Sequence, residues 1–245
     1  MKFTACAIIT VTLLLAAIST PVYAGFFDDL TTVLGGVGGA SVGGLDDATI
    51  TKGLKEALAT GTTRAVKAVS QRDGYFSNDM IKILLPEKVR STADLLGRFG
   101  FQQEVDDFVL SMNRAAEKAA PKATEQFVTA LKDMSFEDAR AILQGDATSA
   151  TRYFRQKTGD KIYADFKPVV VANMKDASVA RYYSHMKEKL ESIPFAGAVG
   201  SFDLDHYVTG KAVDGLFSML GEEEKKIRTD PAARGTELLK KVFGR

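Results

Sequence analysis

This chain has one cysteine, two histidines and almost no net charge, and each shortage excludes a class of chemistry. Cys6 lies in an apolar N-terminal run, so a chain cleaved behind that run would form no disulfide and have no thiol chemistry. Cys6 precedes most of that run, which argues against a lipoprotein anchor. Two histidines fall short of the three or four ligands that a zinc site needs. We therefore expect no metal site and no cofactor.

The charges balance almost completely. The sequence has 32 basic and 31 acidic residues, with a formal net charge of +1. Proteins that bind nucleic acid normally carry a basic excess, so we expect no nucleic-acid partner. Behind the N-terminal run, no apolar stretch reaches the roughly 20 residues that a membrane-spanning helix needs. We therefore expect no transmembrane helix after cleavage.

The first 24 residues have the pattern of a cleavable secretory signal. A short basic start, Met1-Lys2, precedes an apolar run from Ala5 to Ala17. Compact residues at Val22 and Ala24 then form an A-x-A-like cleavage site. We expect cleavage between Ala24 and Gly25 and a periplasmic or secreted protein.

Residues 25–45 differ in composition from the rest of the chain, because glycine dominates residues 35–44. Such a density of glycine favours a flexible tether. Two other interpretations remain open. Glycines at 35, 39 and 43 could let helices approach closely at a membrane, which would make residues 25–45 a peripheral membrane contact. Residues 39–43 also match G-x-S-x-G, but residues 30–37 offer at best a short, glycine-broken strand before that motif.

From residue 46 to residue 245, apolar residues recur at helical spacing, and alternating strand patterns are almost absent. The pattern predicts a single compact, bundle-like all-α domain of roughly eight helices. Expected segments are a helix from 46 to about 72, a loop over 75–85, a helix from 86 to about 98, a stripe from 101 to 119, and helices over 136–145 and up to 159. Four further helices are expected: one interrupted at Pro168, one over 176–192, one that is capped by Asp203 or Asp205 and reaches about 228, and a last amphipathic helix.

Six polar residues form the candidate site: Arg114, Glu117, Arg155, His206, Asp214 and Glu224. Arg114 and Glu117 are spaced as a surface ion pair, or as a buried network if another helix covers that face. Arg155 follows two aromatic residues and could be a surface arginine or clamp an anion.

The long helix expected near the C-terminus has one apolar stripe, and this stripe contains two polar residues, His206 and Glu224. A buried carboxylate is unfavourable without a partner, so we expect Glu224 to be partly buried against Arg228, Arg114 or Arg155. Asp214 and Glu224, with either of those last two arginines, are also the groups that a hydrolase would use.

Several stretches resemble the domain-of-unknown-function family 4197, a group of exported bacterial proteins. They are Leu54–Leu58, Leu85–Lys88, Met112–Glu117, Tyr153–Arg155, Tyr207–Phe217 and Glu222–Arg228. The resemblance covers nearly all of residues 46–245 and implies a helical protein of the bacterial envelope. It implies no catalytic residues.

The expected function is therefore a periplasmic helical binding or interaction protein, with a lipid-like or other apolar small molecule, or another envelope protein, as its partner. The alternative is a hydrolase-type enzyme that uses buried carboxylates and arginines. Geometry separates the two, because an enzyme needs several of these groups to converge in an open pocket.

Overall fold

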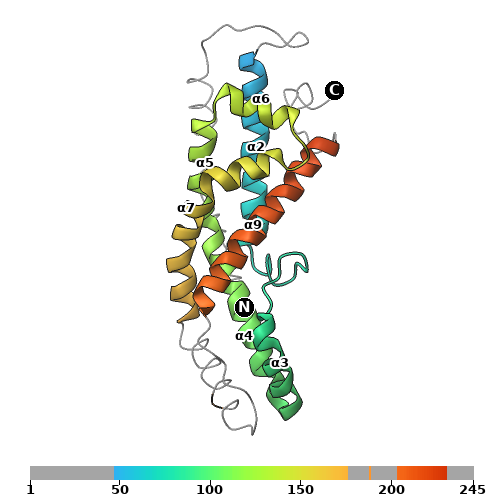
Figure 1. The fold of residues 1–245 in the computed structure, drawn as a ribbon, viewed down its shortest axis with the longest axis vertical. Coiled ribbons are helices and arrows are strands. Elements are labelled where there is room, and N and C mark those ends of the chain that lie inside the picture. Colours follow the sequence, from blue (N-terminus) through green and yellow to red (C-terminus); the bar gives the residue numbers. More distant parts are fainter. Residues whose placement is uncertain (1–46, 176–187, 189–202, 231–245) are drawn as a thin grey trace, which may run out of the picture. The chain divides into compact units, whose positions relative to one another are not determined.

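Helices make up most of the chain in the computed structural model, which describes residues 47–175, 188 and 203–230 (Figure 1). In chain order, they are α2 (Asp47–Ser70), α3 (Glu87–Leu96), the π-helical turn η1 (Gly97–Phe101), α4 (Gln102–Ala119), the 3-10 turn η2 (Ala120–Lys122), α5 (Ala123–Asp133), α6 (Phe136–Gln144), α7 (Ser149–Met174) and α9 (Leu204–Thr229). The described residues contain no strand, and the predicted all-α fold is confirmed.

Several predicted segments lie outside the described residues. They are the signal over residues 1–24, the glycine-rich segment over 25–45, almost all of the helix expected over 176–192, and the last amphipathic helix. None of the described helices is long and apolar enough to cross a membrane.

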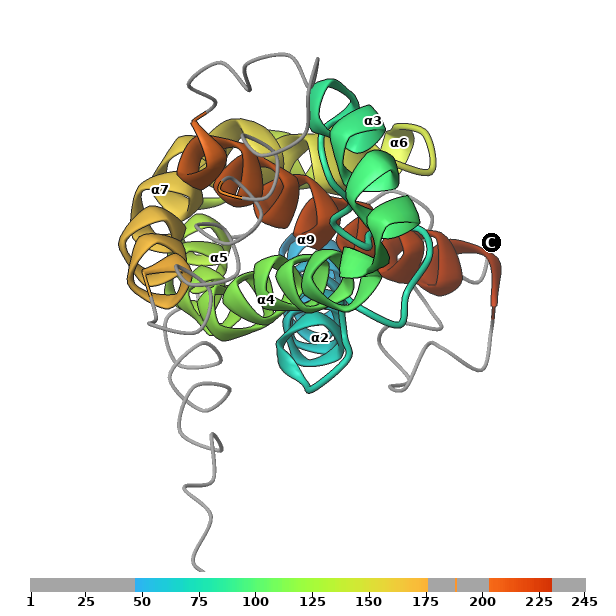
Figure 2. The same cartoon turned by 90° about the horizontal axis from the view of Figure 1, so that it is seen from below.

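The core is built where α9 packs along α7 and crosses α2, while α4 packs against α7 (Figures 1 and 2). Aromatic rings join three of the helices. Phe127 of α5 meets Phe154 of α7 at 5.3 Å between ring centroids and Phe217 of α9 at 5.9 Å, both edge to face. Edge-to-face pairs add to the stabilisation from burial alone. The predicted apolar stripe of the long helix is thus buried at Phe217.

Local signals in the sequence set several helix boundaries. Ser135 caps α6 by accepting a hydrogen bond from the Asp138 amide, and the Asp138 carboxylate accepts one from the Ser135 amide in return. Asp203 caps α9 through the His206 amide at 2.9 Å. Gly100 has a φ of 88°, a left-handed conformation that favours glycine, and it bends the chain between α3 and α4.

Two predicted interruptions are wrong. The sequence predicts that Gly159 ends a helix and that Pro168 interrupts the next, but α7 runs unbroken from Ser149 to Met174. Buried side chains on both sides of Gly159, at Phe154 and Ile162, hold the helix against the core. Pro168 and the residue four positions earlier, Ala164, are exposed, so water can reach the carbonyl that Pro168 leaves without an amide donor.

Candidate functional site

Residues 71–86 form an irregular segment between α2 and α3, and buried polar side chains of α4 hold it in place. Asn113 is fully buried; its side-chain oxygen accepts the Ile83 amide at 2.8 Å, and its side-chain nitrogen donates to the Ile83 carbonyl at 2.9 Å. It therefore replaces the strand partner that this stretch lacks. The backbone hydrogen bonds of α4 do not depend on a buried asparagine side chain. The bonds that Asn113 makes to Ile83 therefore hold the irregular segment against the helix.

Glu117 of α4 holds the beginning of the same segment. Its carboxylate accepts hydrogen bonds from the amides of Tyr75 and Phe76 at 3.2 and 3.3 Å. Arg114 bridges Glu117 at 2.6 Å and Asp73 at 2.7 Å. The prediction of a buried polar network for Arg114 and Glu117 is therefore the one realised, although a loop rather than a helix covers it.

The segment is also fixed to α9. The Tyr75 hydroxyl donates to the Ala212 carbonyl at 2.6 Å, and the Tyr207 hydroxyl donates to the Leu84 carbonyl at 2.9 Å. Gly215 makes the approach possible, because a Cβ at that position would lie 2.6 Å from Tyr75 and 3.2 Å from Ile81. Burial raises the pKa of the Tyr75 phenol, and the nearby charge of Glu117 raises it further.

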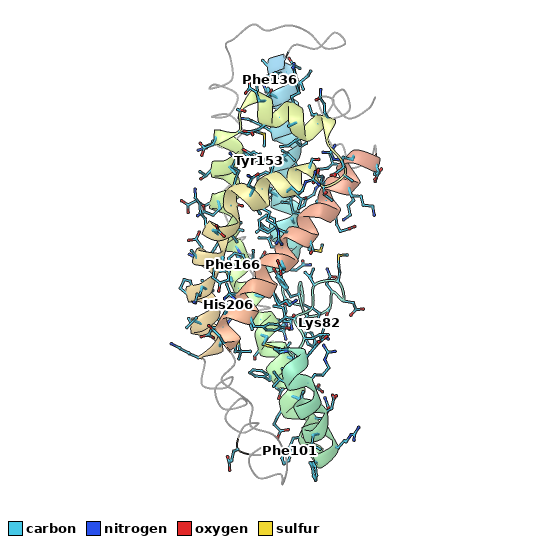
Figure 3. The ribbon with its side chains drawn as sticks, viewed as in Figure 1. Lys82, Phe101, Phe136, Tyr153, Phe166 and His206 are labelled. Carbon is cyan, nitrogen blue, oxygen red and sulfur yellow. The ribbon has the colours of Figure 1, made fainter. Side chains whose placement is uncertain are left out.

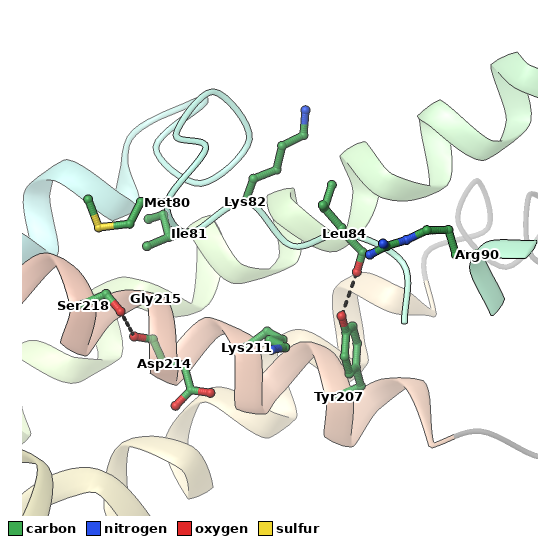
Figure 4. Close-up of a pocket in the computed structure, with 10 residues that line it drawn as sticks. All are labelled: Met80, Ile81, Lys82, Leu84, Arg90, Tyr207, Lys211, Asp214, Gly215 and Ser218. Carbon is green, nitrogen blue, oxygen red and sulfur yellow. Dashed lines mark hydrogen bonds between the residues drawn. The ribbon is translucent and has the colours of Figure 1, made fainter. Parts of the chain in front are cut away.

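A cleft of about 280 Å³ lies between this segment and one stripe of α9 (Figure 4). The helix contributes Tyr207, Lys211, Asp214, Gly215 and Ser218, at spacings that place them on a single helical face. The other wall is Met80, Ile81, Lys82 and Leu84 from the segment, together with Arg90 of α3.

The lining of the cleft carries an excess of positive charge. Lys82, Arg90 and Lys211 are cationic, while Asp214 is the one carboxylate among the lining residues that the structure describes. Asp214 is already paired with Arg155 at 2.8 Å. The Lys82 amine stands 4.1 Å above the Phe76 ring at the rim of the cleft, and Figure 4 shows Lys82 extending away from α9.

Arg90 lies close enough to Tyr207 to act on its ionisation. Burial raises the pKa of the Tyr207 phenol, and the positive charge of Arg90 offsets part of that rise. Chemically, the arrangement can attract and hold an anion, with the Tyr207 hydroxyl engaged in holding the Leu84 carbonyl.

The six predicted site residues are distributed over separate contacts. Arg114 and Glu117 meet at the irregular segment, and Arg155 meets Asp214 at the surface between α7 and α9, with both side chains about half exposed, at 51% and 56%. His206, Asp214 and Glu224 all lie on α9, but separations of eight and ten residues place them roughly 12 and 15 Å apart along its axis.

Glu224 has the burial and the partner that its position predicts. It is 4% exposed and pairs with Arg228 at 2.9 Å. Its two oxygens also accept the amides of Ala150 and Thr151 at 2.9 and 2.8 Å, and the Thr151 hydroxyl at 2.8 Å. Glu224 thereby satisfies donors at the start of α7 that have no partner within that helix. The contacts describe a structural junction between α9 and α7.

His206 does not share the buried face on which the stripe places it. It is exposed in the first turn of α9, where its Nδ1 lies 2.6 Å from the Tyr163 hydroxyl beside α7 (Figure 3). The next member of the stripe, Val213, is the first that is buried, so the stripe does not stay covered to the N-terminal end of α9.

Sequence reasoning missed the residues that form the cleft. Lys82, Arg90 and Lys211 look like ordinary surface cations when each is considered alone. One signal was present in α9, where Tyr207, Lys211, Asp214 and Ser218 share a face that also carries Gly215. A glycine in the middle of a polar helical face indicates that another piece of backbone approaches it.

Within the described residues, no group of three or more histidine, cysteine, aspartate or glutamate side chains could hold a metal ion. No curated protein and no solved structure shows significant similarity to the chain. A family model described as "Protein of unknown function (DUF4197)" matches residues 44–244, which include every residue of the cleft. The chain therefore belongs to the DUF4197 family.

Proposed function

We propose that this protein is a non-catalytic binding protein of the bacterial envelope and that it binds an anionic ligand in the cleft between α9 and residues 71–86. One observation carries the proposal. Arg90 and Lys211 line a cleft of about 280 Å³ with Lys82 at its rim, and the one carboxylate among the described lining residues is already paired with Arg155. Cations grouped around a concave site attract anions and raise their local concentration.

The way in which the cleft wall is held supports this assignment. The irregular segment is fixed to α4 and α9 by four side chains, those of Asn113, Glu117, Tyr75 and Tyr207. A wall fixed before the ligand arrives loses less conformational entropy on binding than a mobile loop would.

The hydrolase alternative has less support from the geometry. Hydrolysis needs a nucleophile or activated water, a base and a stabilising donor within hydrogen-bond reach of one another. Asp214 and Glu224 are roughly 15 Å apart along α9. Glu224 is occupied by the amides of Ala150 and Thr151 and by Arg228.

The compartment rests on residues 1–24 and on the exported proteins that the family resemblance implies. N-terminal sequencing of protein recovered from the periplasm is expected to begin at Gly25. Retention of the first 24 residues would contradict both export and the envelope assignment.

Titration with inorganic phosphate, followed by amide chemical shifts, tests the cleft. We expect shifts concentrated in residues 78–90 and 207–218. A Lys82→Gln/Lys211→Gln variant is expected to lose about tenfold in affinity, because two partly exposed charges are each worth about 0.5–1 kcal/mol. The matched control, Lys122→Gln/Lys167→Gln, removes two exposed lysines elsewhere and should bind like the wild type. Equal affinity for all three proteins would refute the proposal.

A further inference from the structure

Two of the three strongly exposed large apolar side chains among the described residues line this same cleft. The three are Met80 at 62%, Leu84 at 48% and Phe99 at 60% exposure. Met80 and Leu84 both line the cleft, whereas Phe99 is in the turn between α3 and α4. Scattered exposed apolar residues are ordinary, but their grouping at a concave site indicates a binding surface.

Residues 80–85 alternate in burial, and this alternation makes the exposure unusual. Ile81, Ile83 and Leu85 are buried, at 6%, 1% and 6% exposure, while the intervening residues Met80, Lys82 and Leu84 face outward or are half-buried. A stretch of this kind, with one face in the core, normally carries polar residues on the other face. Here two of the three outward positions are apolar, and the third is the cation Lys82.

We infer that the ligand of the cleft is an anionic amphiphile. Its phosphate or carboxylate headgroup would be held by Arg90 and Lys211, and by Lys82 once its side chain turns from Phe76 toward the cleft. Its apolar part would cover Met80 and Leu84. This inference rests on the proposed function and adds the chemical class of the ligand. A simple anion would use the cations but would leave the two apolar side chains in water.

The dimensions of the cleft fit a headgroup better than a whole lipid. Pockets that enclose drug-sized ligands have about 300–1,000 Å³, and this cleft has about 280 Å³. The apolar part of the ligand would therefore lie along the rim, where Met80 and Leu84 are exposed. Methionine suits this role because its unbranched, polarisable side chain adapts to irregular apolar partners.

Three soluble probes separate the contributions: inorganic phosphate, dihexanoyl phosphatidylglycerol and dihexanoyl phosphatidylcholine, the two lipids kept below their micelle concentrations. Calorimetric titration of the full exported chain is expected to give a Kd for the phosphatidylglycerol at least about tenfold lower than for phosphate, because apolar contact is added. The phosphatidylcholine should bind at least about tenfold more weakly than the phosphatidylglycerol, because its headgroup has no net charge.

Two variants then assign the contributions to residues. Met80→Ser/Leu84→Ser should weaken binding of the phosphatidylglycerol about tenfold and leave phosphate binding unchanged. Lys82→Gln/Lys211→Gln should weaken both anionic probes. All four side chains are exposed or lie at the cleft rim, so these substitutions should not disturb folding. An unchanged circular dichroism spectrum checks that each variant is folded.

The outcomes distinguish the two proposals. Equal affinity for phosphate and phosphatidylglycerol, equal affinity for the two lipids, or an unaffected serine variant would overturn the amphiphile inference while the anion cleft remained. Binding of both anionic probes that is unchanged by the lysine substitutions, or no binding of either anionic probe, would overturn the cleft itself and the inference with it.

Discussion

Replacement of Glu224 by glutamine tests whether this carboxylate is a structural junction or part of a binding site. Its oxygens accept hydrogen bonds from the Ala150 amide, from the Thr151 amide and hydroxyl, and from Arg228. A glutamine has only one accepting oxygen, so in either orientation its amide nitrogen faces a donor. Each buried donor left unsatisfied costs about 1–3 kcal/mol, and Arg228 loses its charged partner. Thr151 is only half-buried, and water can compensate there in part, so we expect a loss of about 2–4 kcal/mol in the free energy of unfolding.

Urea and thermal unfolding of the full exported chain measure this loss. At about 2–4 °C per kcal/mol for a chain of this size, the midpoint should fall by about 5–15 °C. Glu222→Gln is the matched control on the same helix, because Glu222 is half-exposed, and it should stay within about 0.5 kcal/mol of the wild type. Phosphate binding should persist in both variants. A Glu224→Gln protein of wild-type stability that no longer binds phosphate would refute the structural interpretation and place Glu224 in the site.

Three further substitutions test the packing. Phe217→Ala is expected to cost about 3–5 kcal/mol, because it empties a buried position beside Phe127; a change near zero in urea unfolding would contradict the assigned core. Asn113→Ala should cost about 2–4 kcal/mol, since it leaves the amide and carbonyl of Ile83 without partners, and the phosphate-induced shifts at residues 78–86 should weaken with it. The pKa of Tyr75 is raised by burial, so its folded form keeps a proton that the unfolded chain releases above about pH 10. That stabilisation is complete below about pH 10 and declines as the pH rises, so Tyr75→Phe should lose less unfolding free energy than the wild type between about pH 9 and about pH 11; equal losses would show that the phenol is not protected.

The parts of the fold that the sequence predicts well are those where a local rule decides the outcome. Phe217, Leu220 and Glu224 follow the helical period of α9, and all three are buried as expected. The caps at Ser135 and Asp203 depend only on neighbouring residues. The period places a residue on a face, but it does not say how far along the helix that face stays covered. His206 is exposed for that reason.

The prediction failed where packing between distant segments overrides a local preference. Gly159 and Pro168 are both unfavourable inside a helix, yet α7 continues through them because its buried residues are held by α4, α5 and α9. The cleft was missed for a related reason. Lys82, Arg90 and Lys211 come from three elements, and only the tertiary fold brings them around one space.

Buried polar residues of α4 hold the segment that forms one wall of the cleft. A connection between α2 and α3 could be a solvent-exposed loop whose backbone bonds to water. Residues 71–86 instead contact both α4 and α9. Tyr75 and Ile83 are buried there, and that placement removes their backbone groups from water. Asn113 and Glu117 supply the missing hydrogen bonds, although burying such side chains on a helix face is unfavourable unless they are fully paired.

The same arrangement leaves Met80 and Leu84 exposed on the outer side of the segment. Inward apolar residues and buried polar partners stabilise the segment, but neither requires apolar side chains on its outer face. Met80 and Leu84 have no role in the stability of the fold that the structure reveals. Their substitution is therefore expected to change binding far more than stability, which separates them from Asn113, whose loss should change both.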